Sequence, residues 1–134
     1  MPARRLLLLP LLLLVSWVVP AAAEEIDTWT TLVEQRKDVV LARLAACETH
    51  GAVLPEGNGY YGRFQFSTGT VIAFVRERDG RTIGAAEAQA LARDDARAAA
   101  LAKYVIFERN GVSHWPACSR KLGLARQISQ IGRL

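Results

Sequence analysis

The chain has 134 residues, of which 51% are hydrophobic and 22% are charged, and its formal net charge is +4. This length is enough for one small domain with one hydrophobic core. No basic run is interleaved with aromatic residues, so the sequence does not favour nucleic acid as a partner.

The N-terminal segment has the pattern of a secretory signal peptide. Arg4 and Arg5 precede an apolar run from Leu6 to Val19, and the small residues Ala21, Ala22 and Ala23 follow. The apolar run is shorter than the ~20 residues that span a bilayer, which disfavours the alternative of a membrane anchor. We therefore expect a signal peptide over residues 1–23, and a secreted, periplasmic or cell-wall-associated protein without a stable membrane anchor after cleavage.

Residues 24–134 then form the mature domain, whose net charge falls to +2 because Arg4 and Arg5 are removed. Its two cysteines, Cys47 and Cys118, would meet an oxidising compartment, so we predict a disulfide between them. Closing a loop of that length stabilises by about 4 kcal/mol in the chain-entropy model. Two buried free thiols are the alternative.

The first helix of the mature domain is predicted from a capping box, with Thr31 as N-cap and Glu34 three residues later. Its apolar residues recur at helical spacing, and His50-Gly51 supplies its end.

Glu48 follows Leu41 and Leu44 at i, i+3, i+7 spacing, which places its side chain on the apolar stripe of this helix. Apolar neighbours and the negative end of the helix dipole both disfavour a charged carboxylate. We therefore predict a raised pKa, toward ~6, which is the property that a general acid needs.

A loop rich in glycine follows from Gly51 to Gly59, and alternation over residues 60–66 predicts an extended segment. Its side chains would divide between an open face and the core. The open face would carry Tyr61, Arg63 and Gln65, and the core face Tyr60, Phe64 and Phe66.

Helices are predicted for most of the remaining chain. Ser67 or Thr68 caps a helix that ends at Asp79-Gly80, and residues 85–92 form a short helix. Asp94 or Asp95 caps a longer helix that ends at Asn110-Gly111. A terminal helix would pack through Leu124, Ala125, Ile128 and Ile131.

Several short motifs, taken together, resemble the catalytic domain of resuscitation-promoting factors. They are Cys-Glu-Thr-x-Gly at 47–51, Gly-Asn-Gly-Tyr-Tyr-Gly at 57–62, Phe-Gln-Phe-Ser at 64–67, Thr70, and Trp-Pro-Ala-Cys at 115–118. More distantly, the glutamate and Gly62-x-x-Gln65 are similar to elements of lytic transglycosylases. The resemblance implies a mainly α, small lysozyme-like fold with a short β-hairpin-like segment and one disulfide.

The resemblance also implies the cleavage of the MurNAc–GlcNAc β-1,4 bond in peptidoglycan glycan strands. Glu48 would be the catalytic acid, and Cys47 and Cys118 would form the family disulfide. The residues implied to bind substrate are Asn58, Tyr60, Tyr61, Gln65, Thr70 and Trp115. We expect a monomer. We also expect no cofactor or metal, because two histidines and two paired cysteines leave no set of metal ligands.

Two alternatives stay open at this point. Glu48 could act alone or with Glu56, and the product could be a hydrolysed or an anhydro sugar, since most glycosidases use two carboxylates. The alternative function is a non-catalytic cell-wall-binding or assembly module that keeps the lysozyme-like fold.

Overall fold

The computed structural model describes residues 21–52 and 57–133. It is mainly α-helical with one two-stranded antiparallel hairpin and one disulfide, so the predicted fold class is confirmed. The elements are α1 (Ala21–Thr49), β1 (Tyr60–Tyr61), β2 (Phe66–Ser67), α2 (Thr68–Asp79), α3 (Ala85–Arg93), α4 (Asp95–Lys103), the π-helical η1 (Tyr104–Glu108), the 3₁₀ turn η2 (Val112–His114), α5 (Pro116–Leu122) and α6 (Leu124–Ile131). Most of the predicted signal peptide lies outside the described residues.

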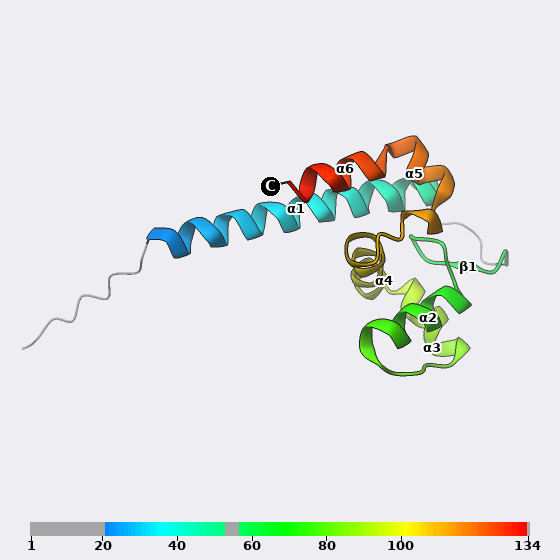
Figure 1. Ribbon diagram of the computed structural model, residues 1–134. Helices are drawn as coiled ribbons and strands as arrows, with labels where there is room; N and C mark the ends of the chain where they lie inside the picture. The colour runs from blue at the N-terminus through cyan, green and yellow to red at the C-terminus, as the bar shows by residue number, and fades with distance from the viewer. Residues whose placement is uncertain (1–20, 53–56, 134) are drawn as a thin grey trace, which may run out of the picture.

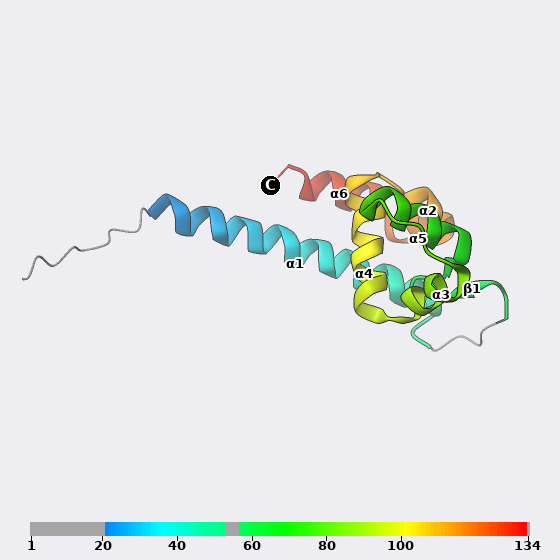
Figure 2. The same ribbon diagram turned by 90° about the horizontal axis from the view of Figure 1, so that it is seen from below.

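Helix α1 is the longest element, and the other helices gather around its C-terminal half (Figure 1). Its N-terminal half extends away from them, as the second view also shows (Figure 2). Helices α5 and α6 pack against one side of α1, and α4 packs against another. The largest fully buried side chains come from α1, α2, α4, η1 and α6: Leu44, Val71, Val75, Leu101, Val105, Ile106 and Leu124.

Helix α1 is longer than the capping box predicted. Thr31 lies inside the helix, so its prediction as N-cap is wrong. No glycine or proline interrupts the chain between Ala21 and His50, and helix formation therefore continues through the local capping signal. The predicted end is confirmed, because His50 and Gly51 both adopt the left-handed conformation that stops a helix.

Residues 60–67 form a tight hairpin instead of one extended segment. Tyr60 pairs with Ser67 and Tyr61 with Phe66, and the chain turns between them. Gln65 has a positive φ of 51°, a conformation that alternation of side chains could not reveal.

The predicted division of the hairpin side chains is partly correct. Phe64 and Phe66 are buried, as expected. Tyr60 was predicted on the same core face, but it is 50% exposed. Its exposure follows from the turn, which breaks the two-residue alternation on which the prediction depended.

The local signals for helices α2 to α4 are confirmed. The Ser67 side chain accepts a hydrogen bond from the Thr70 backbone N–H and caps α2, which ends at Gly80. The Asp94 side chain accepts from the Arg97 N–H at 2.8 Å and caps α4. Such caps satisfy backbone donors that the first helical turn leaves unpaired.

The C-terminal segment forms two helices instead of the single predicted helix. Gly123, with a φ of 63°, separates α5 from α6. Leu124 and Ile131 are buried and Ile128 packs against the core, but Ala125 is exposed, contrary to the prediction.

A disulfide joins Cys47 in the last turn of α1 to Cys118 in α5, which confirms the predicted pairing. It closes a sequence separation of 71 residues and fixes α5 beside the end of α1. Among the residues that the structure describes, no helix combines the length and apolarity that crossing a bilayer requires.

Removal of the disulfide should strongly lower stability. Replacing both Cys47 and Cys118 with serine frees the loop in the unfolded chain, and we expect the free energy of unfolding to fall by about 4 kcal/mol. Urea unfolding of the double variant and of the oxidised wild type measures the difference. Equal midpoints with equal slopes would show that the bridge does not constrain the unfolded chain.

Gly62 should tolerate no side chain, because a Cβ there would overlap the carbonyl group of Ala92 in α3 and its φ is 69°. We expect Gly62→Ala to lower stability by roughly 2 kcal/mol or more and the melting temperature by about 10 °C. Gly59→Ala is the matched control: its φ is 82°, but the added Cβ would meet no atom within 4 Å. If both variants melt together, the contact with α3 is unimportant.

Candidate active site

Glu48 lies in the last turn of α1, where its side chain is partly buried. Leu41 and Ala45 of α1 line a cavity of about 210 Å³ together with Arg63 and Phe64 of the hairpin. Glu48 follows Leu41 by seven residues and Ala45 by three, so it continues the same row along the helix. The hairpin lies at the C-terminal end of α1 (Figure 1), and Glu48 is one turn beyond the cavity residue Ala45 at that end.

The surroundings of Glu48 favour its protonated form. Burial raises the pKa of the carboxyl group, and the nearby His50 imidazole opposes this effect. Among the described residues Glu48 has no ion pair, so no cation fixes its negative charge. The direction of the pKa shift agrees with the prediction, and the group can hold a proton to higher pH than an ordinary glutamate.

The residues on both sides of Glu48 are firmly held. Cys47 is bonded to Cys118. The buried Thr49 hydroxyl donates a 2.8 Å hydrogen bond to the carbonyl oxygen of Ala45 in the preceding turn. The backbone that carries the carboxyl group is thereby fixed before any ligand arrives.

Trp115 belongs to the core, although the resemblance implied that it binds substrate. Its side chain is only 3% exposed, and its ring centroid lies 5.4 Å from that of Phe66. The indole Nε1–H donates a 2.7 Å hydrogen bond to the carbonyl oxygen of Phe64. This burial does not support a direct contact with a ligand, and we assign Trp115 the role of positioning the hairpin.

Asn58, just before the hairpin, and Gln65, within it, are both partly satisfied amides. The Asn58 side-chain oxygen accepts from the Tyr60 N–H at 3.0 Å, and the Gln65 Nε2 donates to the Gly62 carbonyl at 2.9 Å. The amino group of Asn58 and the side-chain oxygen of Gln65 have no partner among the described residues. One donor and one acceptor are therefore available to a polar ligand.

The two tyrosines of the hairpin differ in what they offer. Tyr60 is half exposed, and its ring is accessible. Tyr61 packs against the core, and the Arg93 guanidinium lies 4.9 Å from its ring centroid. Arg93 was not predicted as a site residue, because a cation–π contact between α3 and β1 leaves no signal in the local sequence.

Thr70 lies in the first turn of α2 and takes part in its cap. Its hydroxyl is 2.8 Å from the Ser67 hydroxyl, next to strand β2. Its predicted contact with substrate remains a prediction. Glu56, the candidate second carboxylate, lies outside the described residues. No group of three or more histidine, cysteine or acidic side chains with metal-binding geometry occurs within residues 21–52 and 57–133.

Comparison with known proteins identifies a family domain in this chain. A model of the transglycosylase-like domain matches residues 36–118, which contain Glu48, the hairpin and both cysteines. The chain is 30% identical over 119 residues to resuscitation-promoting factor Rpf of Micrococcus luteus. That match covers 88% of this chain but only 43% of the relative. No solved structure matches the chain.

The resemblance to resuscitation-promoting factors is thus confirmed by the relative, and the matched residues extend from the middle of α1 to the disulfide in α5. Since the domain model covers more than half of the sequence, this chain belongs to the family of transglycosylase-like domains.

Proposed function

We propose that the protein cleaves the β-1,4 bond between MurNAc and GlcNAc in peptidoglycan, with Glu48 as general acid and base. The observation that carries this proposal is the placement of Glu48. It is a partly buried carboxyl group with a raised pKa and no ion pair among the described residues, in the last turn of α1 and one turn beyond the cavity residue Ala45. The family match supports the same class of reaction.

In the proposed reaction, the protonated Glu48 donates its proton to the glycosidic oxygen as the bond to the anomeric carbon breaks. The sugar ring then carries positive charge, which the newly formed Glu48 carboxylate stabilises. The same carboxylate next accepts a proton from the attacking nucleophile. A water molecule gives hydrolysis, whereas a hydroxyl group of the same sugar gives an anhydro product, and the proton balance is equal for both.

The hairpin supplies the proposed substrate contacts. The exposed Tyr60 ring can stack against a sugar face, as half-exposed aromatic rings do. The Asn58 amino group and the Gln65 side-chain oxygen can hydrogen-bond to hydroxyl or acetamido groups. Thr70, at the start of α2, completes the set.

We further propose that the protein acts outside the cytoplasm as a monomer, after removal of residues 1–23. The disulfide supports this location, because such bonds persist in oxidising compartments. The peptidoglycan substrate lies in the same compartment.

Glu48→Gln should abolish most of the activity. The amide cannot donate or accept the proton, and general acid–base catalysis contributes about 10²- to 10⁴-fold. Mass spectrometry of products released from purified peptidoglycan measures the rate and distinguishes hydrolysed from anhydro sugars. Glu108→Gln is the control, since Glu108 is an exposed acid of η1 away from the hairpin. A Glu48→Gln variant with wild-type activity excludes this residue as the acid, and an inactive wild type favours the wall-binding module.

The rate should also depend on pH through Glu48. A general acid must be protonated, and burial raises its pKa, so activity should persist above the ~4.3 of an ordinary glutamate and decline as pH rises through the raised value.

The pH dependence of folding stability also reports the pKa of Glu48. Between the unfolded and folded pKa values the folded protein binds more protons, so its stability falls as pH rises. The wild type should therefore lose stability relative to Glu48→Gln over this pH range, as measured by thermal unfolding. A constant difference across the range would contradict the raised pKa.

A further inference from the structure

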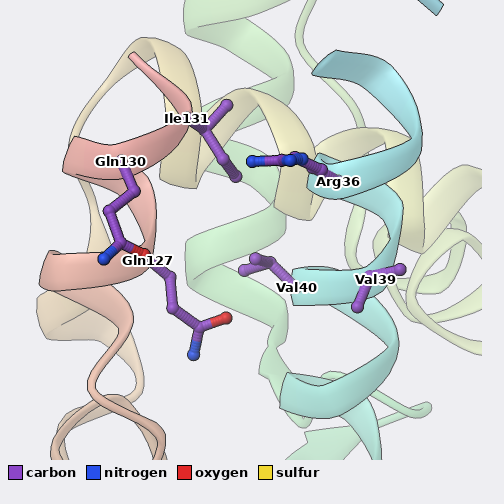
Figure 3. Close-up of a pocket in the computed structure, with 6 residues that line it drawn as sticks. All are labelled: Arg36, Val39, Val40, Gln127, Gln130 and Ile131. Atoms are coloured by element: carbon purple, nitrogen blue, oxygen red, sulfur yellow. The ribbon is translucent and has the colours of Figure 1, made fainter. Parts of the chain in front are cut away.

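A groove separates α6 from the middle of α1. It has a volume of about 170 Å³, and its lining residues are Arg36, Val39, Val40, Gln127, Gln130 and Ile131. Figure 3 shows the Arg36 guanidinium extending from α1 toward Ile131 of α6. We call it the α1–α6 groove. Helix α6 follows residues 36–118, which the transglycosylase-like domain model matches, whereas the α1 side of the groove lies within them.

The α1–α6 groove is separate from the proposed catalytic site. Arg36, Val40 and Cys47 occupy one row of α1, which faces α5 and α6. Leu41, Ala45 and Glu48 occupy a neighbouring row about 100° around the helix. Arg36 also precedes Glu48 by 12 residues, which is about 18 Å along the axis.

The charged side chains after Glu108 are all basic. No acidic residue follows Glu108, whereas Arg120, Lys121, Arg126 and Arg133 do. All four are exposed, and none has an ion pair among the described residues. Lys103, by contrast, is paired: its Nζ lies 3.0 Å from a carboxylate oxygen of Glu34 and 2.6 Å from one of Asp38.

Arg36 is the charged residue among those that line the groove, and further cations lie on or next to the two helices that border it. On α6, Arg126 precedes Gln130 by four residues and therefore shares its face, and Arg133 follows in the next turn. On α1, Arg43 follows Arg36 by seven residues, on the same face. No acidic residue lines the groove. The repulsion between these cations is relieved when an anion lies between them.

An exposed aromatic ring extends the α1 side of the groove. Trp29 precedes Arg36 by seven residues, so it lies on the same face, and it is 47% exposed. It belongs to the N-terminal part of α1, which extends beyond the end of α6 (Figure 1). An exposed indole on a polar helix face is suited to stack against a flat apolar surface such as a sugar ring. The Gln130 amide and the Gln127 side-chain oxygen can bind hydroxyl groups, while the Gln127 Nε2 is engaged with the Leu122 carbonyl at 2.7 Å.

We propose that the α1–α6 groove is an accessory site that holds a peptidoglycan strand through the carboxylates of its stem peptides and the face of its sugars. This inference rests on the proposed function, because it takes the substrate polymer as the ligand. The cations in and beside the groove favour an anionic partner, and Trp29 with the two glutamines favours an acidic glycan. A membrane surface fits less well, since the apolar residues Leu124 and Ile131 of α6 are buried and cannot insert into lipid.

Binding to insoluble peptidoglycan tests the site without requiring turnover. The full chain carrying Glu48→Gln is co-sedimented with purified peptidoglycan from which hydrofluoric acid has removed phosphodiester-linked polymers. The groove variant adds Arg36→Gln, Arg126→Gln and Arg133→Gln. We expect its affinity to fall about tenfold at low salt, and the difference to shrink as salt rises.

The matched control adds Arg76→Gln, Arg81→Gln and Arg97→Gln to the same parent. These three arginines are exposed and lie on or near α2 to α4, so the control loses equal charge away from the groove. Its affinity should stay within about twofold of the parent. A further variant, Trp29→Ala, should weaken binding at high salt as well, because stacking is not screened. Thermal unfolding of each variant establishes that it is folded.

Equal binding by the groove variant and the control would overturn the accessory site. Binding only to walls that were not treated with hydrofluoric acid would show that the cations bind phosphodiester-linked polymers. Binding to vesicles of anionic lipid but not to peptidoglycan would show that they bind a membrane. Either result overturns the proposal. Absence of product release by the wild type with groove-dependent binding intact would instead refute the proposed catalysis alone.

Discussion

The hydrogen bond from the Trp115 indole to the Phe64 carbonyl is the contact on which the site depends. It is buried and 2.7 Å long, and the disulfide of Cys118 lies three residues further along the chain. The start of α5 therefore holds the hairpin with one residue and the end of α1 with another. A buried indole donor that lost its acceptor would cost about 1–3 kcal/mol, so the pair keeps the hairpin in one position.

This anchoring makes it possible to keep an uncompensated acid at the end of α1. A partly buried carboxyl group without a cation destabilises the folded chain when it ionises, because burial favours the neutral form. The disulfide and the Thr49 hydrogen bond to Ala45 stabilise the same turn without adding positive charge. A salt bridge in their place would stabilise the turn too, but it would lower the pKa that the proposed general acid requires.

The sequence predicted those features that depend on neighbouring residues. The Ser67 and Asp94 caps, the helix end at Gly51 and the cysteine pairing follow from local chemistry or from compartment, and the structure has all of them. The prediction of Thr31 as N-cap was wrong because a capping residue begins a helix only where the preceding residues are not helical. The role of Trp115 and the contact of Arg93 with Tyr61 could not be predicted, since each joins segments that are at least 32 residues apart.

Two neighbouring rows of side chains on α1, offset by one residue in the sequence, have different electrostatic requirements. Residues 44–47, the turn of α1 before Glu48, carry no cation, and a positive charge so close to Glu48 would favour its carboxylate. The neighbouring row carries Arg36 and Arg43. Among the described residues, the electrostatic effect that lowers the pKa of Glu48 comes from His50. Solvent screens Arg36 at about 18 Å, since the Debye length is about 8 Å at physiological salt. One helix can therefore hold a cationic polymer-binding face and a protonated acid, provided that the two rows keep this spacing.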